Sequence, residues 1–386
     1  MTFNNYTKTK KTAGKKSGKV YNRMIKMITA FVCAAALILS AGCTTNPVVP
    51  GPGETSEGDG LKIVCTIYPI YDWTENVLGD KAGDADVKLL MDSGMDMHSF
   101  QPTAQDIAEI SNADIFIYVG GESDGWVDDA LKEATNKDMK VINLLEYLGN
   151  EVKEEELVEG MQEEEEHDHD ADADADHDHS DGDADADADH DHSDGDADDD
   201  ADHEEEEVEY DEHVWLSVRL AKTLSLYIEE AIAEKDPDNA DLYKQNFDSY
   251  AAKLDQLDRE YEEAVESAPR DTILVGDRFP FRYMVDDYGL KYYAAFAGCN
   301  AETEASFETI TFLADKVDEL DLNVILTLES SDQKIADSIK RTSKKRECDI
   351  VVMDSLQSVT AEDVNNGISY LDVMRQNLEA LKKALN

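Results

Sequence analysis

The sequence predicts an α/β protein built from two α/β lobes that are joined by a long helix. Short apolar runs alternate with segments of helical periodicity before residue 150 and again after residue 268, which is typical of parallel βαβ units. Between these two regions, residues 213–267 keep apolar side chains at helical spacing, with one interruption near Pro237. The chain of 386 residues is long enough for two domains of ordinary size.

The first lobe is expected at residues 61–150. Its strands, where apolar and β-branched residues cluster, are predicted at residues 61–68, 87–90, 114–119 and 140–144. Its helices are predicted after Pro69, from about Pro102, and at residues 126–134. A loop that carries His98 precedes the second of these helices, so this histidine lies where a strand gives way to a helix.

The linking helix, at residues 213–267, is followed by a second lobe at residues 268–386. Apolar runs predict the strands of this lobe at residues 272–275, 324–328 and 350–353. Helical periodicity predicts its helices at residues 281–288, 306–319, 333–342 and 370–385. Folds of this kind bind ligands at the carboxyl ends of their strands, so candidate site residues are expected in the loops there.

The N-terminal region, residues 1–43, has the features of a bacterial lipoprotein signal. Eight basic residues and no acidic one lie in residues 8–26, and an apolar run at residues 27–40 is too short to cross a membrane comfortably. The run ends in LSAGC, which resembles a lipobox and implies cleavage before Cys43 and lipid attachment to it. Residues 44–60 are then expected to be a flexible tether.

An acidic, histidine-rich run lies within a loop expected at residues 151–212. Residues 161–210 contain 27 acidic side chains and no lysine or arginine, so the run is predicted to be disordered. Imidazole and carboxylate groups together suit a borderline divalent metal such as zinc. A solvated acidic linker is the alternative, but such a linker needs no histidine, so we favour metal collection. The seven histidines of the run are His167, His169, His177, His179, His190, His192 and His203.

Charge and cysteine content narrow the classes of partner. The net charge of −53 excludes nucleic acid, whose binding needs a basic surface, and favours a cation. Beyond the signal region and Cys43, the cysteines are Cys65, Cys299 and Cys348, and none of them lies in a CxxC pair. A thiolate zinc site is therefore not predicted, whereas a disulfide between Cys299 and Cys348 is left open.

Several motifs together resemble the substrate-binding lipoproteins of zinc and manganese ABC importers, the metal-binding cluster of solute-binding proteins. They are the lipobox, MHSFQPT at residues 97–103, DEHVWLS at 211–217, YMVDDYGL at 283–290 and ETEAS at 302–306. The resemblance covers residues 39–386, and the histidine-rich insertion before the second motif resembles the zinc branch. It implies two α/β lobes linked by a rigid helix, with the metal ion in the cleft between the lobes.

The resemblance also implies metal ligands. His98 and His213 are the only histidines outside the acidic run, and each lies where a loop meets a helix. At the family's third ligand position this chain has Arg278, which cannot bind a metal ion because its guanidinium stays protonated. Its neighbour Asp277 is the candidate replacement. Alternatively, Arg278 pairs with Asp277 beside the site and a water molecule completes the metal's shell.

For the fourth ligand, the resemblance points to the end of the strand at residues 324–328. Asp332 is the candidate there, and Glu329 is the alternative. Either carboxylate could instead be a surface group or a helix cap. Two histidines with one or two carboxylates fit Zn²⁺ and also tolerate Mn²⁺, and the histidine-rich run favours Zn²⁺.

The expected function is capture of Zn²⁺ outside the cytoplasm and its delivery to an ABC permease and its ATPase. The protein is expected to be a monomer, held by its lipid on the extracytoplasmic face of the cell membrane. Alternatives are a manganese-binding subunit of the same class of importer, and a surface adhesin or metal buffer. A metallohydrolase is disfavoured because the chain has no HExxH motif.

Overall fold

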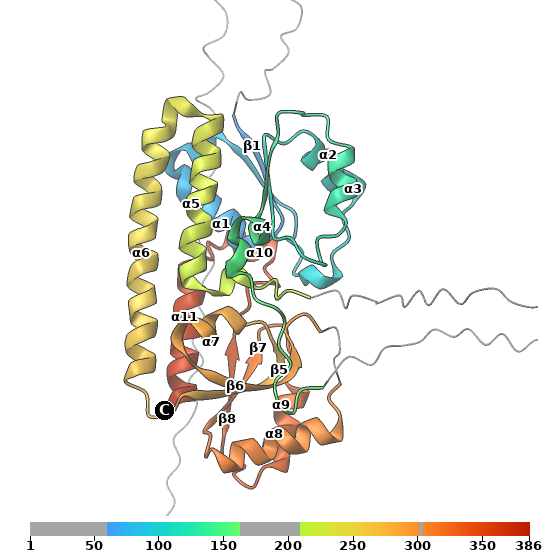
Figure 1. The fold of residues 1–386 in the computed structure, drawn as a ribbon, viewed down its shortest axis with the longest axis vertical. Coiled ribbons are helices and arrows are strands. Elements are labelled where there is room, and N and C mark those ends of the chain that lie inside the picture. Colours follow the sequence, from blue (N-terminus) through green and yellow to red (C-terminus); the bar gives the residue numbers. More distant parts are fainter. Residues whose placement is uncertain (1–59, 163–208, 301–303) are drawn as a thin grey trace, which may run out of the picture. The chain divides into compact units, whose positions relative to one another are not determined.

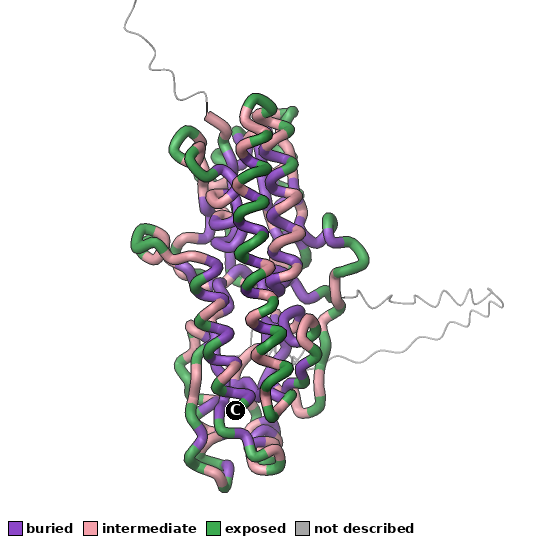
Figure 2. The backbone as a smooth tube through the Cα atoms, turned by 90° about the vertical axis from the view of Figure 1, so that its left-hand side faces the viewer, coloured by how far each residue is buried: buried purple, intermediate pink, exposed green. Residues whose placement is uncertain are grey.

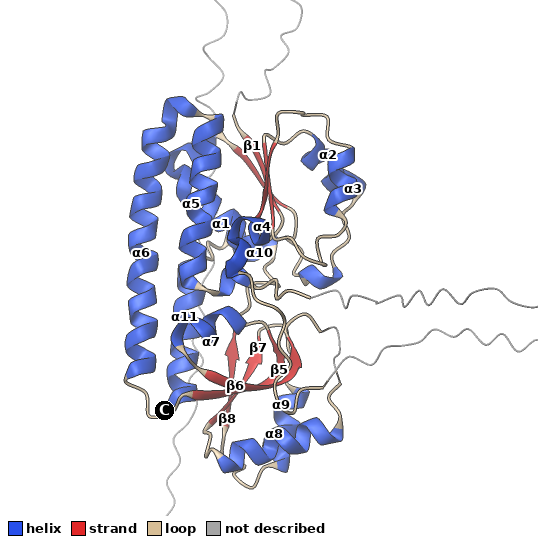
Figure 3. Ribbon diagram, viewed as in Figure 1, coloured by secondary structure: helices blue, strands red, loops and turns tan. Residues whose placement is uncertain are grey.

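The computed structural model describes residues 60–162, 209–300 and 304–386. Within these ranges it contains two four-stranded parallel sheets, in the orders β2-β1-β3-β4 and β6-β5-β7-β8. Figures 1 and 3 show each sheet with its own helices, so the prediction of two α/β lobes is confirmed. The predicted signal and lipobox, the tether up to residue 59 and the seven histidines of the acidic run lie outside the described residues.

The first lobe is built around β1 (Lys62–Cys65), which lies between β2 (Asp86–Leu89) and β3 (Ile115–Tyr118). The outer strand β4 (Lys140–Asn143) pairs with β3. Residues at the centre of β1 and β3 are apolar and fully buried, because helices cover both faces of a parallel sheet. The helical segments of this lobe are α1 (Tyr68–Leu78), η1 (Gly79–Asp84), η2 (Met97–Ser99), α2 (Ala104–Ser111), α3 (Val127–Lys132), α4 (Leu144–Leu148) and η3 (Gly149–Glu151).

The second lobe has β5 (Thr272–Phe279) and β7 (Val324–Leu328) at the centre of its sheet. The edge strands are β6 (Lys291–Ala297) and β8 (Asp349–Met353). β6 is absent from the strands expected from the sequence, because three of its residues KYYAAFA are alanines, which are depleted in strands. The helices of this lobe are α7 (Arg282–Tyr288), α8 (Phe307–Glu319), α9 (Lys334–Thr342), α10 (Ala361–Asn365) and α11 (Tyr370–Leu385).

The tract at residues 213–267, predicted as a linking helix that is broken or bent near Pro237, is broken there into a helical hairpin, which is preceded by the short turn η4 (Val214–Leu216). α5 (Val218–Lys235) and α6 (Ala240–Glu266) are packed against each other, and η5 (Pro237–Asn239) connects them. Pro237 has no backbone N–H to donate and its ring obstructs the preceding turn, so the chain turns back there rather than bending.

The long helix that joins the lobes is α6. It packs against α1 in the first lobe and against α11 in the second. Tyr250 of α6 donates a hydrogen bond to Asp72 of α1 at 3.2 Å, and Tyr261 donates to the Met374 carbonyl of α11 at 2.6 Å. Buried and exposed residues alternate along the helix (Figure 2), as expected for one apolar face. None of the described helices is both long enough and apolar enough to cross a membrane.

Candidate metal centre

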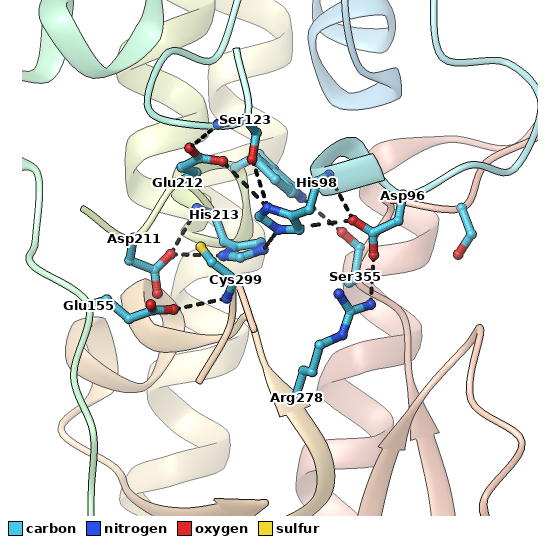
Figure 4. Close-up of polar contacts among 12 residues, drawn as sticks. Asp96, His98, Ser123, Glu155, Asp211, Glu212, His213, Arg278, Cys299 and Ser355 are labelled. Carbon is cyan, nitrogen blue, oxygen red and sulfur yellow. Dashed lines mark hydrogen bonds and ion pairs between the residues drawn. The ribbon is translucent and has the colours of Figure 1, made fainter. Parts of the chain in front are cut away.

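His98 and His213 meet at one point (Figure 4). His98 lies in η2, which follows β2, and His213 immediately precedes η4. Their Nε2 atoms are 3.3 Å apart. In a tetrahedral zinc site with Zn–N bonds of about 2.0–2.1 Å, two nitrogen ligands are separated by about 3.3 Å. The two imidazoles therefore have the spacing of a pair of zinc ligands.

Asp211 fixes the orientation of His213. The His213 side chain is fully buried, and its Nδ1 lies 2.9 Å from Asp211 Oδ1. The same oxygen accepts the His213 backbone N–H at 2.8 Å, while Tyr283 donates its hydroxyl to the Asp211 carbonyl. When a metal ion binds at Nε2, a carboxylate at Nδ1 holds the remaining ring proton on Nδ1 and keeps the ring in that orientation.

The ring of His98 is held at its Nδ1 atom, on the side away from His213, and its backbone is also fixed by a hydrogen bond. Its Nδ1 lies 2.7 Å from Ser123 Oγ and 3.7 Å from Glu212 Oε2, and its backbone N–H donates to Asp96 Oδ1 at 3.1 Å. Burial and the neighbouring His213 lower the pKa of His98 to about 3, so the ring is neutral at pH 7. Neutral imidazole is the form that binds a metal ion.

A third donor in this cluster is the thiol of Cys299, which the sequence analysis does not place in the site. The ligand atoms of His98, His213 and Cys299 all lie within 4.8 Å of one another. Burial raises the pKa of Cys299, opposed by a hydrogen bond from the Glu212 backbone. Cys299 and Cys348 are both free, so the disulfide left open by the sequence is not formed. If β6 had been predicted as a strand, Cys299 would have been a candidate ligand, because it lies two residues beyond the carboxyl end of that strand.

Asp277 and Arg278 are placed differently from the predictions. Asp277 accepts the Arg278 backbone N–H at 2.9 Å and the Thr327 hydroxyl at 3.1 Å, and it is not part of the three-residue cluster. The Arg278 guanidinium pairs with Asp96 at 2.6 Å rather than with Asp277. Arg278 therefore contacts the carboxylate that caps the turn of His98.

Asp332 and Glu329, the two candidates for a fourth ligand, both form contacts with residues outside the histidine cluster. Asp332 is exposed, and its carboxylate pairs with Lys334 at 2.5 Å and accepts the Lys334 backbone N–H. Glu329 accepts hydrogen bonds from the Ser355 and Ser358 hydroxyls and from the Ser355 backbone. The structure brings neither carboxylate into the His98–His213–Cys299 cluster.

Gln357 is a further neighbour of the histidines that the sequence does not reveal. Its amide nitrogen donates to both oxygens of Asp96 at 3.0 and 2.9 Å, and its amide oxygen accepts a hydrogen bond from His213 Nε2 at 2.6 Å. The amide thus reaches the nitrogen that faces His98. A metal ion bound to His213 Nε2 would displace it.

Two parallel α/β lobes on one long helix, with two oriented imidazoles at ligand spacing, define a metal-binding solute-binding protein. The family model described as "Zinc-uptake complex component A periplasmic" matches residues 63–384, and the chain belongs to this family.

Individual relatives agree with this assignment. The high-affinity zinc uptake system protein ZnuA of Bacillus subtilis is 32% identical over 356 residues, which cover 92% of this chain and 96% of the relative. The zinc-binding lipoprotein AdcA of Streptococcus pneumoniae is 29% identical, and the match covers 94% of this chain but 61% of AdcA.

Solved structures show the same architecture. The metal-dependent lipoprotein YcdH of B. subtilis matches with a TM-score of 0.60 and 28% identity, covering 84% of this chain and 99% of that one. The Zn(II)-bound ZnuA-like domain of S. pneumoniae AdcA matches with a TM-score of 0.59 and 26% identity, over 84% of this chain and 99% of the domain.

Proposed function

We propose that this chain captures Zn²⁺ outside the cytoplasm and delivers it to an ABC permease that is driven by an ATPase. The observation that carries the proposal is the 3.3 Å separation of His98 Nε2 and His213 Nε2, with the opposite nitrogens held by Ser123 and Asp211. In metal sites, the ring nitrogen of a histidine that does not bind the metal is characteristically hydrogen-bonded to a neighbouring group, which orients the imidazole. The names of the relatives, a zinc uptake protein and a zinc-binding lipoprotein, support zinc as the cargo.

The protein acts by binding and release, without a covalent step. We place it as a monomer on the extracytoplasmic face of the cell membrane, anchored through a lipid on Cys43. The lipobox sequence supports the anchor, and so does the similarity to the zinc-binding lipoprotein AdcA.

The acidic run collects metal ions for the site in this proposal. Its described flanks are hydrogen-bonded to the folded part of the chain: the Gln162 backbone donates to the Ala295 carbonyl of β6, and the Asp211 backbone donates to the Lys153 carbonyl. Two residues after Asp211 the chain reaches His213. An ion held by the histidines of the run is thereby kept near the site, which raises its local concentration.

Calorimetric titration of residues 44–386 with Zn²⁺, and separately with Mn²⁺, tests the proposal. We expect one tight zinc site, several weaker zinc sites and weak manganese binding. His98→Ala and His213→Ala should abolish the tight site, whereas deletion of residues 163–207 should remove only the weaker ones. Tight binding of manganese with zinc confined to the weak sites would instead make this a manganese-binding subunit.

A further inference from the structure

We propose that Cys299 is the third protein ligand of the metal ion, so that the site is formed by two imidazoles and one thiolate. This inference rests on the proposed function and specifies its site more closely. The thiol proton leaves to water as the sulfur binds the ion. Zinc accepts such mixed nitrogen and sulfur shells in a tetrahedral arrangement.

The distances within the cluster fit such a site after a small shift. The three ligand atoms lie within 4.8 Å of one another, and the two nitrogens already have the zinc spacing. With Zn–S bonds of about 2.3 Å and Zn–N bonds of about 2.0–2.1 Å, a sulfur and a nitrogen in a tetrahedral shell lie about 3.6 Å apart. The sulfur therefore needs to move by about 1 Å, within the range of a side-chain adjustment.

The backbone at the carboxyl end of β6 is built to bring Cys299 close to His213. Gly298 lies against the imidazole, because a Cβ placed there would be 3.1 Å from both Cε1 and Nδ1 of His213 and 2.9 Å from the Phe279 carbonyl oxygen. The next residue, Cys299, donates its backbone N–H to Glu155 Oε1 at 2.9 Å. Figure 4 shows the cysteine side chain beside the His213 ring.

The neighbouring strand explains why a ligand from β6 is needed. At the end of β5, Arg278 cannot bind a metal ion and is paired with Asp96, while Asp277 is engaged with Thr327. β6 is hydrogen-bonded next to β5, with Phe279 opposite Ala297. The residues just beyond β6 therefore bring a metal-binding side chain of the second lobe to the histidines, and Cys299 is the donor among them in the described cluster.

A thiolate has a consequence for metal choice. Sulfur is a soft donor that suits zinc, whereas manganese prefers carboxylate, carbonyl and water oxygens. A shell of two histidines and one cysteine therefore favours zinc over manganese more strongly than two histidines with carboxylates do. The selectivity of the site is then set by Cys299.

Cobalt(II) spectroscopy on the purified protein, with the acidic run intact, tests the proposal. One equivalent of Co²⁺ should give a thiolate-to-cobalt charge-transfer band in the near ultraviolet, because residues 163–208 contain no cysteine and cannot produce one. Cys299→Ser should lose the band, and His98→Ala should lose or markedly weaken it. Cys348→Ser is the matched control, since Cys348 is a buried free thiol in the apolar core of the second lobe, and it should keep the band.

The outcomes separate this inference from the proposed function. Tight binding of one ion that depends on His98 and His213, without a charge-transfer band, overturns the role of Cys299 and leaves the proposed function intact. Absence of any tight site in the unmodified protein overturns the proposed function.

A second measurement needs no variant. With less than one equivalent of zinc, X-ray absorption should show one sulfur neighbour of the ion at about 2.3 Å. A shell of nitrogen and oxygen alone overturns the proposal even where Cys299→Ser fails to fold.

Discussion

The guanidinium of Arg278 and the carboxylate of Asp96 form an ion pair of 2.6 Å that joins the second lobe to the turn carrying His98. Asp96 caps that turn by accepting the His98 backbone N–H, so the position of one imidazole depends on Arg278, which lies 182 positions after Asp96 in the chain. Both side chains are mostly shielded from water, which strengthens such a pair relative to surface ion pairs.

Replacing Arg278 by methionine should weaken zinc binding about tenfold to 100-fold, the range typical for groups that orient metal ligands. The reason is that Asp96 loses its partner and the turn of His98 is held less firmly. Competition with a zinc chelator measures the change. Lys291→Met, which removes an exposed ion pair with Asp271, is the control and should leave the affinity unchanged. Equal affinities for both variants would contradict a role for the Arg278–Asp96 pair.

Replacing Asp211 by asparagine should also lower zinc affinity about tenfold to 100-fold, because the carboxylate that keeps the proton on His213 Nδ1 is lost. The same chelator competition applies. Asp255→Asn, in an exposed ion pair with Lys222, controls for the loss of one negative charge. An effect of equal size in both variants would indicate long-range electrostatics rather than orientation of His213.

Gly298→Ala should displace the end of β6 or the His213 ring, because the added Cβ would lie 2.9 Å from the Phe279 carbonyl and 3.1 Å from the imidazole. We expect weaker zinc binding and, given the role proposed for Cys299, a weaker cobalt–thiolate band. Gly83→Ala is the control, since a Cβ at that position meets no atom within 4 Å. Unchanged binding and an unchanged band in Gly298→Ala would show that this close approach does not position the site.

Asp124 should make the stability of the metal-free protein pH-dependent. Burial raises the pKa of Asp124 from 3.8 to about 7, and its Oδ1 atom is buried without a hydrogen-bond partner. The folded state thus favours the protonated group, and this contribution is fully present below about pH 4 and is lost as the pH rises through about 7. The loss is on the order of 4 kcal/mol at most.

Thermal melts of the unmodified protein and Asp124→Asn at pH 5 and pH 8 check this expectation. Asparagine stays neutral and keeps an acceptor for the Gly120 N–H, which donates to Asp124 at 2.9 Å. The variant should therefore gain in melting temperature relative to the unmodified protein between pH 5 and pH 8. A difference that does not change with pH would mean that Asp124 stays ionised throughout.

Local patterns in the sequence predict the two lobes and both histidines. The strands with β-branched residues and the two histidine motifs carry their signals within a few residues, so they can be recognised without the fold. β6 lacks such a signal, and Cys299 was missed with it. The contacts of Arg278 with Asp96, and of Ser123 with His98, join residues distant in the sequence, and only tertiary packing sets them. Tertiary packing also decides the position of Asp332. It follows the strand β7 closely in the sequence, but its side chain pairs with Lys334 and is not in the cluster with the histidines.

Two hydrogen bonds of α6, made by Tyr250 and Tyr261, limit how the site can open. This helix of 27 residues is about 40 Å long, and Tyr250 and Tyr261 fasten it to the first and second lobe respectively. Both lobes are thus attached to the same helix. A wide separation of the lobes would break the buried hydrogen bond of Tyr250, that of Tyr261, or both. Release of the ion to the permease should then proceed through movement of the short turns around His98 and His213, while α6 and the two lobes keep their positions.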